Sequence, residues 1–379
     1  MFPEFMTADT PWKVRWKAKR NAIFASPAFQ YWTAKIPFSR PIARHRATQM
    51  FDHIVGFTYS RVLLAVVESG LLEVLKDGPV SARDVAGHAD LSEDAALCLL
   101  RAARALDVAE EVLPDQWMLG QQGAILAANA GALAMIRHHR LLYRDLAEPL
   151  ELLRKDRKEP TELSRFWSYA GALHGASEAG RDTSEYSQLM AASQHFVAEE
   201  VLNSFSFPKQ GSLLDVGGGH GAFLQQVGAA YPQLKLGLFD LPEVAETGAT
   251  ALGETLGTER LNLHPGSFFD DPIPGGYDLV SLVRILHDHD DGPALQLLRN
   301  IRTSLGPNSR LMIAEPMAGI RGAEGMGEAF FGLYLWAMGS GRARSVPEIT
   351  AMLREAGFSR TRTVATSQPV VASIIVASA

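Results

Sequence analysis

The chain has 379 residues, of which 47% are hydrophobic and 21% are charged, and its formal net charge at pH 7 is −6. This length and composition are typical of a soluble protein with two folded domains, and they exclude a disordered or fibrous chain. The single cysteine, Cys98, excludes an intramolecular disulfide and a cysteine-cluster metal site, and it fits a cytoplasmic location. No stretch approaches the roughly 18 uninterrupted apolar residues of a spanning helix, so we expect a soluble or peripheral protein.

Residues 1–50 are predicted to form a basic, aromatic N-terminal arm. Nine lysine and arginine residues, seven aromatic residues and no acidic residue lie between Pro11 and Arg46. Cations bind anionic lipid headgroups and amphipathic rings favour the membrane interface, so residues 11–46 fit a peripheral contact with the inner membrane. Packing against the chain's own domains or a dimer partner explains the same residues, and nucleic-acid binding is a third interpretation. Because the overall charge is negative, we expect no nucleic-acid partner.

Residues 51–140 show helical periodicity and are predicted to form a winged-helix-like dimerisation domain. Ser81 and Ser92 each fit the N-cap of a short helix, and residues 108–119 fit the wing. Such a domain often reads DNA, so a regulator that senses a cofactor is an alternative. The candidate second helix, residues 92–106, has a mixed rather than a basic charge face, which favours dimerisation.

Residues 141–207 are predicted to form a helical linker, and residues 208–379 an α/β domain with a Rossmann-like, doubly wound parallel sheet. After Pro208, short apolar runs alternate with amphipathic stretches, as in strands joined by crossover helices. Ser345 and Glu348 form a capping box that predicts a helix ending at Ala356. The predicted strands are Ser212–Val216, Leu234–Phe239, Leu261–His264, Tyr277–Val283, Arg310–Ala314 and Val371–Val376.

A glycine-rich turn follows the first predicted strand. Gly217 and Gly219 let the backbone approach a ligand and point amide groups at it. Asp240 ends the next strand about twenty residues later, where its carboxylate is expected to accept hydrogen bonds from both ribose hydroxyls of a nucleoside. The same glycine spacing also fits a dinucleotide-binding unit, and a solvated loop acid is the alternative for Asp240.

The stretch after the third predicted strand is expected to meet the base of that nucleoside. Phe268 is predicted to stack on adenine, and Ser267, a small polar residue, to meet the edge of the base. Core packing is the alternative for Phe268 and for its neighbour Phe269.

A histidine follows the fourth predicted strand. His287 falls at the carboxyl end of that strand, where ligands bind, and a neutral imidazole there can act as a general base beside the bound nucleoside. Glu315 closes the fifth strand and is expected to hold the imidazole tautomer and stabilise the imidazolium, although pairing with Arg284 is an alternative. His289 is an alternative base. No distant side chains complete a metal site around these histidines, so no metal is expected.

Four motifs together resemble the O-methyltransferase family that includes plant caffeate-type enzymes: residues 214–221, 239–242, 266–269 and 285–288. The resemblance implies S-adenosylmethionine as the cofactor, a winged-helix dimerisation domain, a helical linker over the active site and His287 as the base. By position, its cofactor contacts fall on Gly217, Asp240, Ser267, Phe268 and Val283. Glu315 matches one of two acids that flank the histidine in this family, whereas Ala343 stands at the position of the second.

The N-terminal stretches 25–30 and 38–44, together with Arg284, are similar to those of bacterial hydroxycarotenoid O-methyltransferases of the demethylspheroidene and hydroxyneurosporene group. This similarity implies a long apolar polyene with a tertiary hydroxyl as the methyl acceptor. Phenolic, quinone and bacteriochlorophyllide acceptors remain alternatives within the same chemistry.

The acceptor is expected to be an apolar small molecule. Residues 329–338 fit an apolar helix that lines a pocket for it, with Phe331, Tyr334 and Trp336 as candidate contacts. Met190, on the linker, is a further candidate. Core packing explains the same residues.

Overall fold

The computed structural model describes residues 11–154, 159–167, 183–369 and 371–378. The chain divides into two compact units, Met1–Gln122 and Gly123–Ala379. The boundaries predicted at residues 50, 140 and 207 divide the chain more finely and stay predictions.

The first unit begins with three helices: α1 (Trp12–Ala25), α2 (Pro27–Lys35) and α3 (Arg40–Glu68). The basic arm is therefore helical, and prolines in the first turns of α2 and α3 help start both helices. Neither α1 nor α2 buries a residue, and α3 buries only Val66 and Val67. Among the described residues, α3 is the one helix long and apolar enough to cross a membrane, a property that helices of soluble proteins share.

The remainder of the first unit is a winged helix, as predicted. Its elements are α4 (Leu71–Lys76), α5 (Ala82–Ala89), α6 (Glu93–Ala105) and the antiparallel strands β1 (Ala109–Leu113) and β2 (Gln116–Leu119). Ser81 and Ser92 accept hydrogen bonds from the first turns of α5 and α6, which confirms both N-caps. Arg104 of α6 pairs with Glu111 of the wing at 2.9 Å, so that cation is neutralised within the unit.

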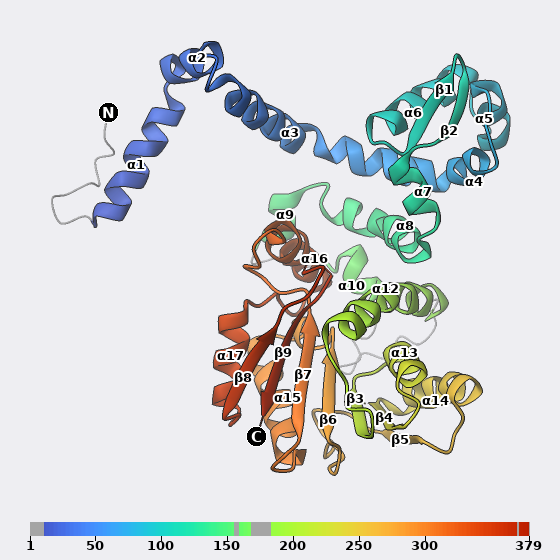
Figure 1. Ribbon diagram of the computed structural model, residues 1–379, viewed down its shortest axis with the longest axis vertical. Coiled ribbons are helices and arrows are strands. Elements are labelled where there is room, and N and C mark those ends of the chain that lie inside the picture. Colours follow the sequence, from blue (N-terminus) through green and yellow to red (C-terminus); the bar gives the residue numbers. More distant parts are fainter. Residues whose placement is uncertain (1–10, 155–158, 168–182, 370, 379) are drawn as a thin grey trace. The chain divides into compact units, whose positions relative to one another are not determined.

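The second unit contains a seven-stranded sheet in the order β5-β4-β3-β6-β7-β9-β8 (Figure 1). The strands are β3 (Gly211–Val216), β4 (Leu234–Asp240), β5 (Leu261–Pro265), β6 (Leu279–Val283), β7 (Arg310–Glu315), β8 (Arg360–Val364) and β9 (Ser373–Ser378). All pairings are parallel except those of β9 with β7 and β8. The six predicted strands are confirmed. The sequence prediction missed β8, because this edge strand alternates arginine and threonine instead of burying apolar residues.

Helices cover both faces of this sheet. They are α13 (Ala222–Ala230), α14 (Pro242–Leu256), α15 (Asp291–Ser304) and α17 (Val346–Glu355), with α12 (Thr183–Ser204) on the side of α13. Successive strand residues face opposite ways: Leu213 packs in the cluster of α12 and α13, and Leu214 in that of α15 and α17. Burying one such leucine contributes about 1.5–3 kcal/mol, so continuously apolar strands fit this position.

Shorter elements complete the second unit. They are α7 (Gln121–Ala127), which begins at the unit boundary, α8 (Ala130–Asp145), α9 (Pro149–Leu153), α10 (Glu162–Phe166), the 3₁₀ turn η1 (Leu286–Asp288), the π-helical turn η2 (Gly325–Phe330) and α16 (Phe331–Met338). Leu142, Leu152 and Leu163 pack with Leu335 of α16 in one apolar cluster, so α8, α9 and α10 lie against α16. Residues 168–182 of the predicted helical linker lie outside the described residues.

The sheet order places the candidate site. Strand succession runs outward from β3 to β4 and β5 on one side and from β6 to β7 on the other. The carboxyl ends of β3 and β6 therefore border the point where the order reverses, which is where open α/β sheets bind ligands. The glycine turn follows β3, and the turn that carries His287 follows β6.

Candidate functional site

The glycine turn after β3 is shaped by positive backbone angles. Gly217 has φ +71°, and a Cβ added there would lie 2.6 Å from the Ile285 side chain. Gly219 has φ +57°, and nothing lies within 4 Å of the position of its missing Cβ. The turn therefore packs against the His287 turn at Gly217 and leaves open space for a ligand at Gly219.

Asp240 at the end of β4 is tied to this turn. Its two carboxylate oxygens accept hydrogen bonds from the backbone N–H of Gly219 at 2.8 Å and of Leu241 at 2.7 Å. Burial raises the pKa of Asp240, and these two hydrogen bonds oppose the rise. Each oxygen keeps a lone pair, so the predicted binding of ribose hydroxyls stays compatible with this geometry.

A second carboxylate under the turn was missed by the sequence prediction. Asp215 is buried in β3, and the hydroxyl of Ser281 donates to it at 2.6 Å. Burial, reinforced by the charge of Asp240, raises the pKa of Asp215 to about 7 despite the Ser281 hydrogen bond. The signal in the sequence was an aspartate between apolar residues of a strand, which is costly unless the group is hydrogen-bonded.

The segment after β5 lies beside the His289 ring. Phe268 and Phe269 are half-buried against the core, and their ring centroids lie 5.5 and 5.1 Å from that of His289. The hydroxyl of Ser267 donates to Asp270 at 2.8 Å. Adenine stacking by Phe268 and a base contact by Ser267 stay predictions, as does the contact of Val283, which is buried at the end of β6.

His287 lies on η1 and is 3% exposed. Its Nε2 lies 3.1 Å from the carboxylate of Asp288, and its Nδ1 lies 3.7 Å from that of Glu315. The phenyl ring of Phe331 contacts the imidazole edge-on, with 5.7 Å between centroids. The fold thus brings His287, Glu315 and Phe331 together, and Asp288 is a second acid that the sequence prediction did not assign.

Glu315 acts mainly on the backbone of the turn. One of its oxygens accepts the N–H groups of Leu286 and, at 3.2 Å, of His287. These are N–H groups at the start of a helical turn, which lack partners within it. The 3.7 Å separation from Nδ1 is too long for a hydrogen bond, so Glu315 fixes the turn and places a charge beside the ring. The predicted hydrogen bond that would hold the tautomer is absent from these contacts.

The two carboxylates decide the protonation of the imidazole. Burial by itself lowers the pKa of His287, but the charge and hydrogen bond of Asp288 and the nearby Glu315 outweigh it and raise the pKa to about 9. Burial lowers the pKa of His289, whose ring lies against the two phenylalanines. The surroundings therefore stabilise a proton on His287 and destabilise one on His289.

Only one of the predicted acceptor contacts on α16 meets His287. Phe331 does so, whereas the hydroxyl of Tyr334 is bonded to His138 at 2.7 Å and accepts from Trp167 at 3.1 Å. Trp336 is 49% exposed, and its indole N–H donates to a backbone carbonyl of α9. Met190 lies in α12, where its side chain is outside the described residues.

Three buried polar atoms near these elements have no hydrogen-bond partner in the part of the chain that the structure describes: His287 Nδ1, His139 Nε2 and Gln194 Oε1. The His139 ring contacts that of Phe330, which contacts Phe331 in turn. Buried polar atoms are normally hydrogen-bonded. The unpaired Nδ1 of His287, whose turn packs against the glycine turn at Gly217, fits a polar ligand such as a nucleoside or the hydroxyl of an acceptor.

Comparisons with known proteins bear on this site. Residues 143–359 match the O-methyltransferase domain family. The chain is 40% identical to demethylspheroidene O-methyltransferase of Cereibacter sphaeroides over 352 residues, which cover 93% of this chain and 92% of that protein. It is 39% identical to the enzyme of the same name from Rhodobacter capsulatus over 341 residues, covering 90% and 84%.

A solved structure shows the same fold. SAH-bound CalO1, a methyltransferase in calicheamicin biosynthesis, superposes with a TM-score of 0.74 at 24% identity, over 88% of this chain and 98% of its own. The predicted fold class, an α/β domain with an N-terminal winged helix, is confirmed.

Replacing Asp288 with asparagine is expected to move the pH dependence of turnover. A base must be neutral, so activity falls as the pH drops through the pKa of His287, which is raised above its ordinary 6.5. Without the Asp288 charge, burial dominates and the pKa falls, so the acidic limb of the kcat/KM profile should move to lower pH. Glu355→Gln removes a remote, exposed charge and should leave the limb in place. An acidic limb shared by all three proteins would contradict this assignment.

Replacing Gly217 with alanine is expected to weaken cofactor binding. The positive φ strains alanine by about 1–3 kcal/mol, and its methyl group would collide with Ile285. We expect the affinity for S-adenosylhomocysteine, measured by calorimetry, to fall on the order of tenfold. Gly292→Ala, in the open first turn of α15, is the matched control and should bind normally. Normal binding by Gly217→Ala would show that this turn does not form the cofactor site.

Proposed function

We propose that this chain, which belongs to the O-methyltransferase family, methylates the tertiary hydroxyl of a hydroxycarotenoid of the demethylspheroidene or hydroxyneurosporene type. The chain is an S-adenosylmethionine-dependent O-methyltransferase. The 40% identity to demethylspheroidene O-methyltransferase over 93% of the chain is the observation that supports this acceptor class.

The cofactor supplies an electrophilic methyl group on a positively charged sulfur. Gly217, Gly219 and Asp240 would hold its amino-acid and ribose parts, where the turn is open and the carboxylate has spare lone pairs. Ser267, Phe268 and Val283 would border its adenine.

His287 would take the hydroxyl proton as the acceptor oxygen attacks the methyl group. With Nε2 donating to Asp288, the neutral ring has its acceptor lone pair on Nδ1, which is unpaired among the described residues. Protonation at Nδ1 gives an imidazolium between the carboxylates of Asp288 and Glu315. An aliphatic alcohol is a very weak acid, so stabilisation of the developing imidazolium favours this reaction.

The acceptor would lie along α16. Phe331 meets the base, and Leu335 and Tyr334 continue this apolar helix into the cluster formed with α8, α9 and α10. An apolar wall suits a polyene, although phenolic, quinone or bacteriochlorophyllide acceptors would use the same base.

The acceptor class is tested with labelled S-adenosylmethionine and a panel of hydroxycarotenoids, phenols and quinones. We expect transfer to the tertiary hydroxyl of a hydroxycarotenoid. His287→Ala should lower kcat by roughly two to four orders of magnitude while cofactor affinity stays nearly unchanged, because the base acts only in the chemical step. Transfer only to phenols or quinones would refute the acceptor, and wild-type kcat in His287→Ala would refute the base.

We also propose that the chain works as a homodimer. A groove of about 350 Å³ between α3 and α6 is almost wholly apolar and includes Val62, Ala65 and Leu99. A second copy of the winged-helix unit would cover such a groove.

Finally, we propose that the enzyme is cytoplasmic and docks on the inner membrane through residues 11–46. Trp12, Trp16 and Ile23 lie on one face of α1, four and seven residues apart, and all three are exposed. Phe38, between α2 and α3, is 94% exposed. Basic side chains stand among these rings, and each cation near an anionic surface contributes about 1 kcal/mol.

The charge distribution also supports an orientation on the membrane. Nine of the 36 basic residues and none of the 42 acidic residues lie in residues 11–46, so the remaining chain has 27 basic against 42 acidic residues. An anionic bilayer would attract the arm and repel the rest, which keeps the contact peripheral.

Flotation of the full-length enzyme with lipid vesicles tests this contact. We expect binding to vesicles that contain phosphatidylglycerol, little binding to pure phosphatidylcholine, and release by salt. The variant Trp12→Ser/Trp16→Ser should bind less, whereas Leu113→Ser, an exposed apolar residue of the wing, should bind normally. Unchanged flotation of the double variant would contradict the proposal. If the double variant also became a monomer while it still bound lipid, the arm would be a dimer contact instead.

A further inference from the structure

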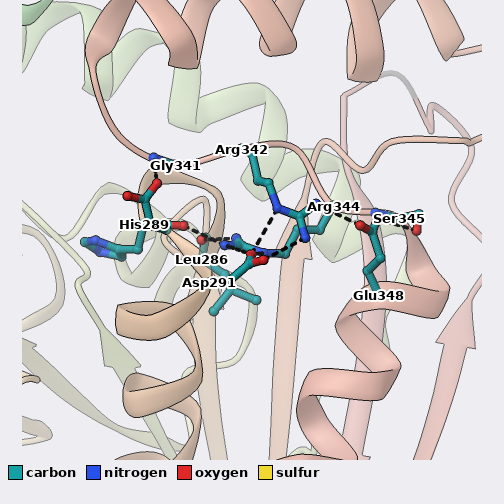
Figure 2. Close-up of polar contacts among 9 residues, drawn as sticks. Leu286, His289, Asp291, Gly341, Arg342, Arg344, Ser345 and Glu348 are labelled. Atoms are coloured by element: carbon teal, nitrogen blue, oxygen red, sulfur yellow. Dashed lines mark hydrogen bonds and ion pairs between the residues drawn. The ribbon is translucent and has the colours of Figure 1, made fainter. Parts of the chain in front are cut away.

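A buried arginine closes the turn that carries His287. Arg344 is 1% exposed and lies on the segment between α16 and α17. Its guanidinium donates to the backbone carbonyls of Leu286 and His289, each at 2.7 Å. These two carbonyls stand on either side of His287 and Asp288, so one side chain bridges both ends of the turn (Figure 2).

The same guanidinium is anchored outside the turn. Its Nε and Nη2 both donate to one carboxylate oxygen of Asp291, at 3.0 and 2.8 Å, at the start of α15. Arg342 donates to both oxygens of Asp291 and pairs with Glu348 of α17, but it is 42% exposed (Figure 2). A planar guanidinium can make several such bonds at fixed angles, which a lysine ammonium cannot do.

Two residues shortly before Arg344 in the sequence contact the same turn. The hydroxyl of Ser340 donates to the carbonyl of Asp288 at 3.0 Å. Gly341 has φ +81°, and a Cβ there would lie 2.1 Å from the carbonyl oxygen of His287. Ser340, Gly341 and Arg344 therefore contact the carbonyl side of the turn, while Glu315 accepts from its N–H groups.

We infer that Arg344 is a positioning residue for the reaction: by bonding the Leu286 and His289 carbonyls, it holds the His287 imidazole in place. The inference deepens the proposed function and rests on His287 as its base. Because Ser340, Gly341 and Arg344 follow α16 after its C-cap Gly339, the residues that contact the His287 turn are close in sequence to the helix proposed to contact the acceptor. Displacing a reacting group by about 1 Å can cost on the order of 100-fold in rate.

The test compares Arg344→Lys and Arg344→Met with wild type, and uses Arg342→Met as the matched control that loses the exposed contact to Asp291. We expect kcat of both Arg344 variants to fall on the order of 10- to 100-fold, while the affinity for S-adenosylhomocysteine and the KM for S-adenosylmethionine change by less than about threefold. Arg342→Met should keep kcat within about twofold. If Arg344→Met fails to fold, Arg344→Lys alone is compared with wild type, because lysine keeps the aliphatic part of the side chain and its positive charge.

A second readout needs no acceptor and so separates this inference from the proposed function. The pKa of the His287 imidazole can be followed by NMR in each variant. Loss of positioning moves the ring away from Asp288 and Glu315, so its pKa should fall, whereas loss of a cation that acts only by its charge would raise the pKa. A lower pKa in Arg344→Met, or in Arg344→Lys, supports the inference. The inference would be overturned by an unchanged or raised pKa of His287 or by a wild-type kcat. It would also be overturned by a kcat loss that is matched by equal losses of cofactor affinity and melting temperature.

Discussion

A buried imidazole between two carboxylates is the interaction on which the rest of the site depends. His287 is almost inaccessible to water, so a proton on its ring must be stabilised by the protein itself. Asp288 and Glu315 do this, and they raise the pKa of His287 where burial alone would lower it. The rest of the second unit holds His287, Asp288 and Glu315 beside the glycine turn.

The pairing of β3 with β6 holds the His287 turn beside the glycine turn. These strands pair at Leu213 and Leu279, which lie 66 residues apart in sequence, and the pairing brings the turns that follow them together. Ile285, two residues before His287, occupies the space where a side chain at position 217 would lie. The glycine that opens the turn after β3 is therefore required by the packing of the His287 turn, so the proposed cofactor and base sites depend on each other.

Apolar runs, caps and glycines predicted most of the fold, because each reflects a local requirement. They were enough to place six strands, the N-caps at Ser81 and Ser92, and His287 at the end of β6. The strand β8 was missed because its polar alternation matches its edge position. The roles of Asp288 and Arg344 were missed because they depend on side-chain direction around a 3₁₀ turn and on a contact between segments over fifty residues apart. Likewise, helical spacing did not show that Phe331 contacts His287 while Trp336 is half exposed.

The most direct measurement of the central claim is the pKa of the His287 imidazole in two cofactor complexes, read by NMR of histidine-labelled enzyme without acceptor. S-adenosylmethionine and S-adenosylhomocysteine differ by one methyl group and one positive charge on sulfur. If that sulfur lies beside the imidazole, the pKa should be lower with S-adenosylmethionine by about one pH unit or more, because the sulfonium charge opposes protonation of the ring. Equal pKa values in the two complexes would place the methyl group away from His287 and contradict the account.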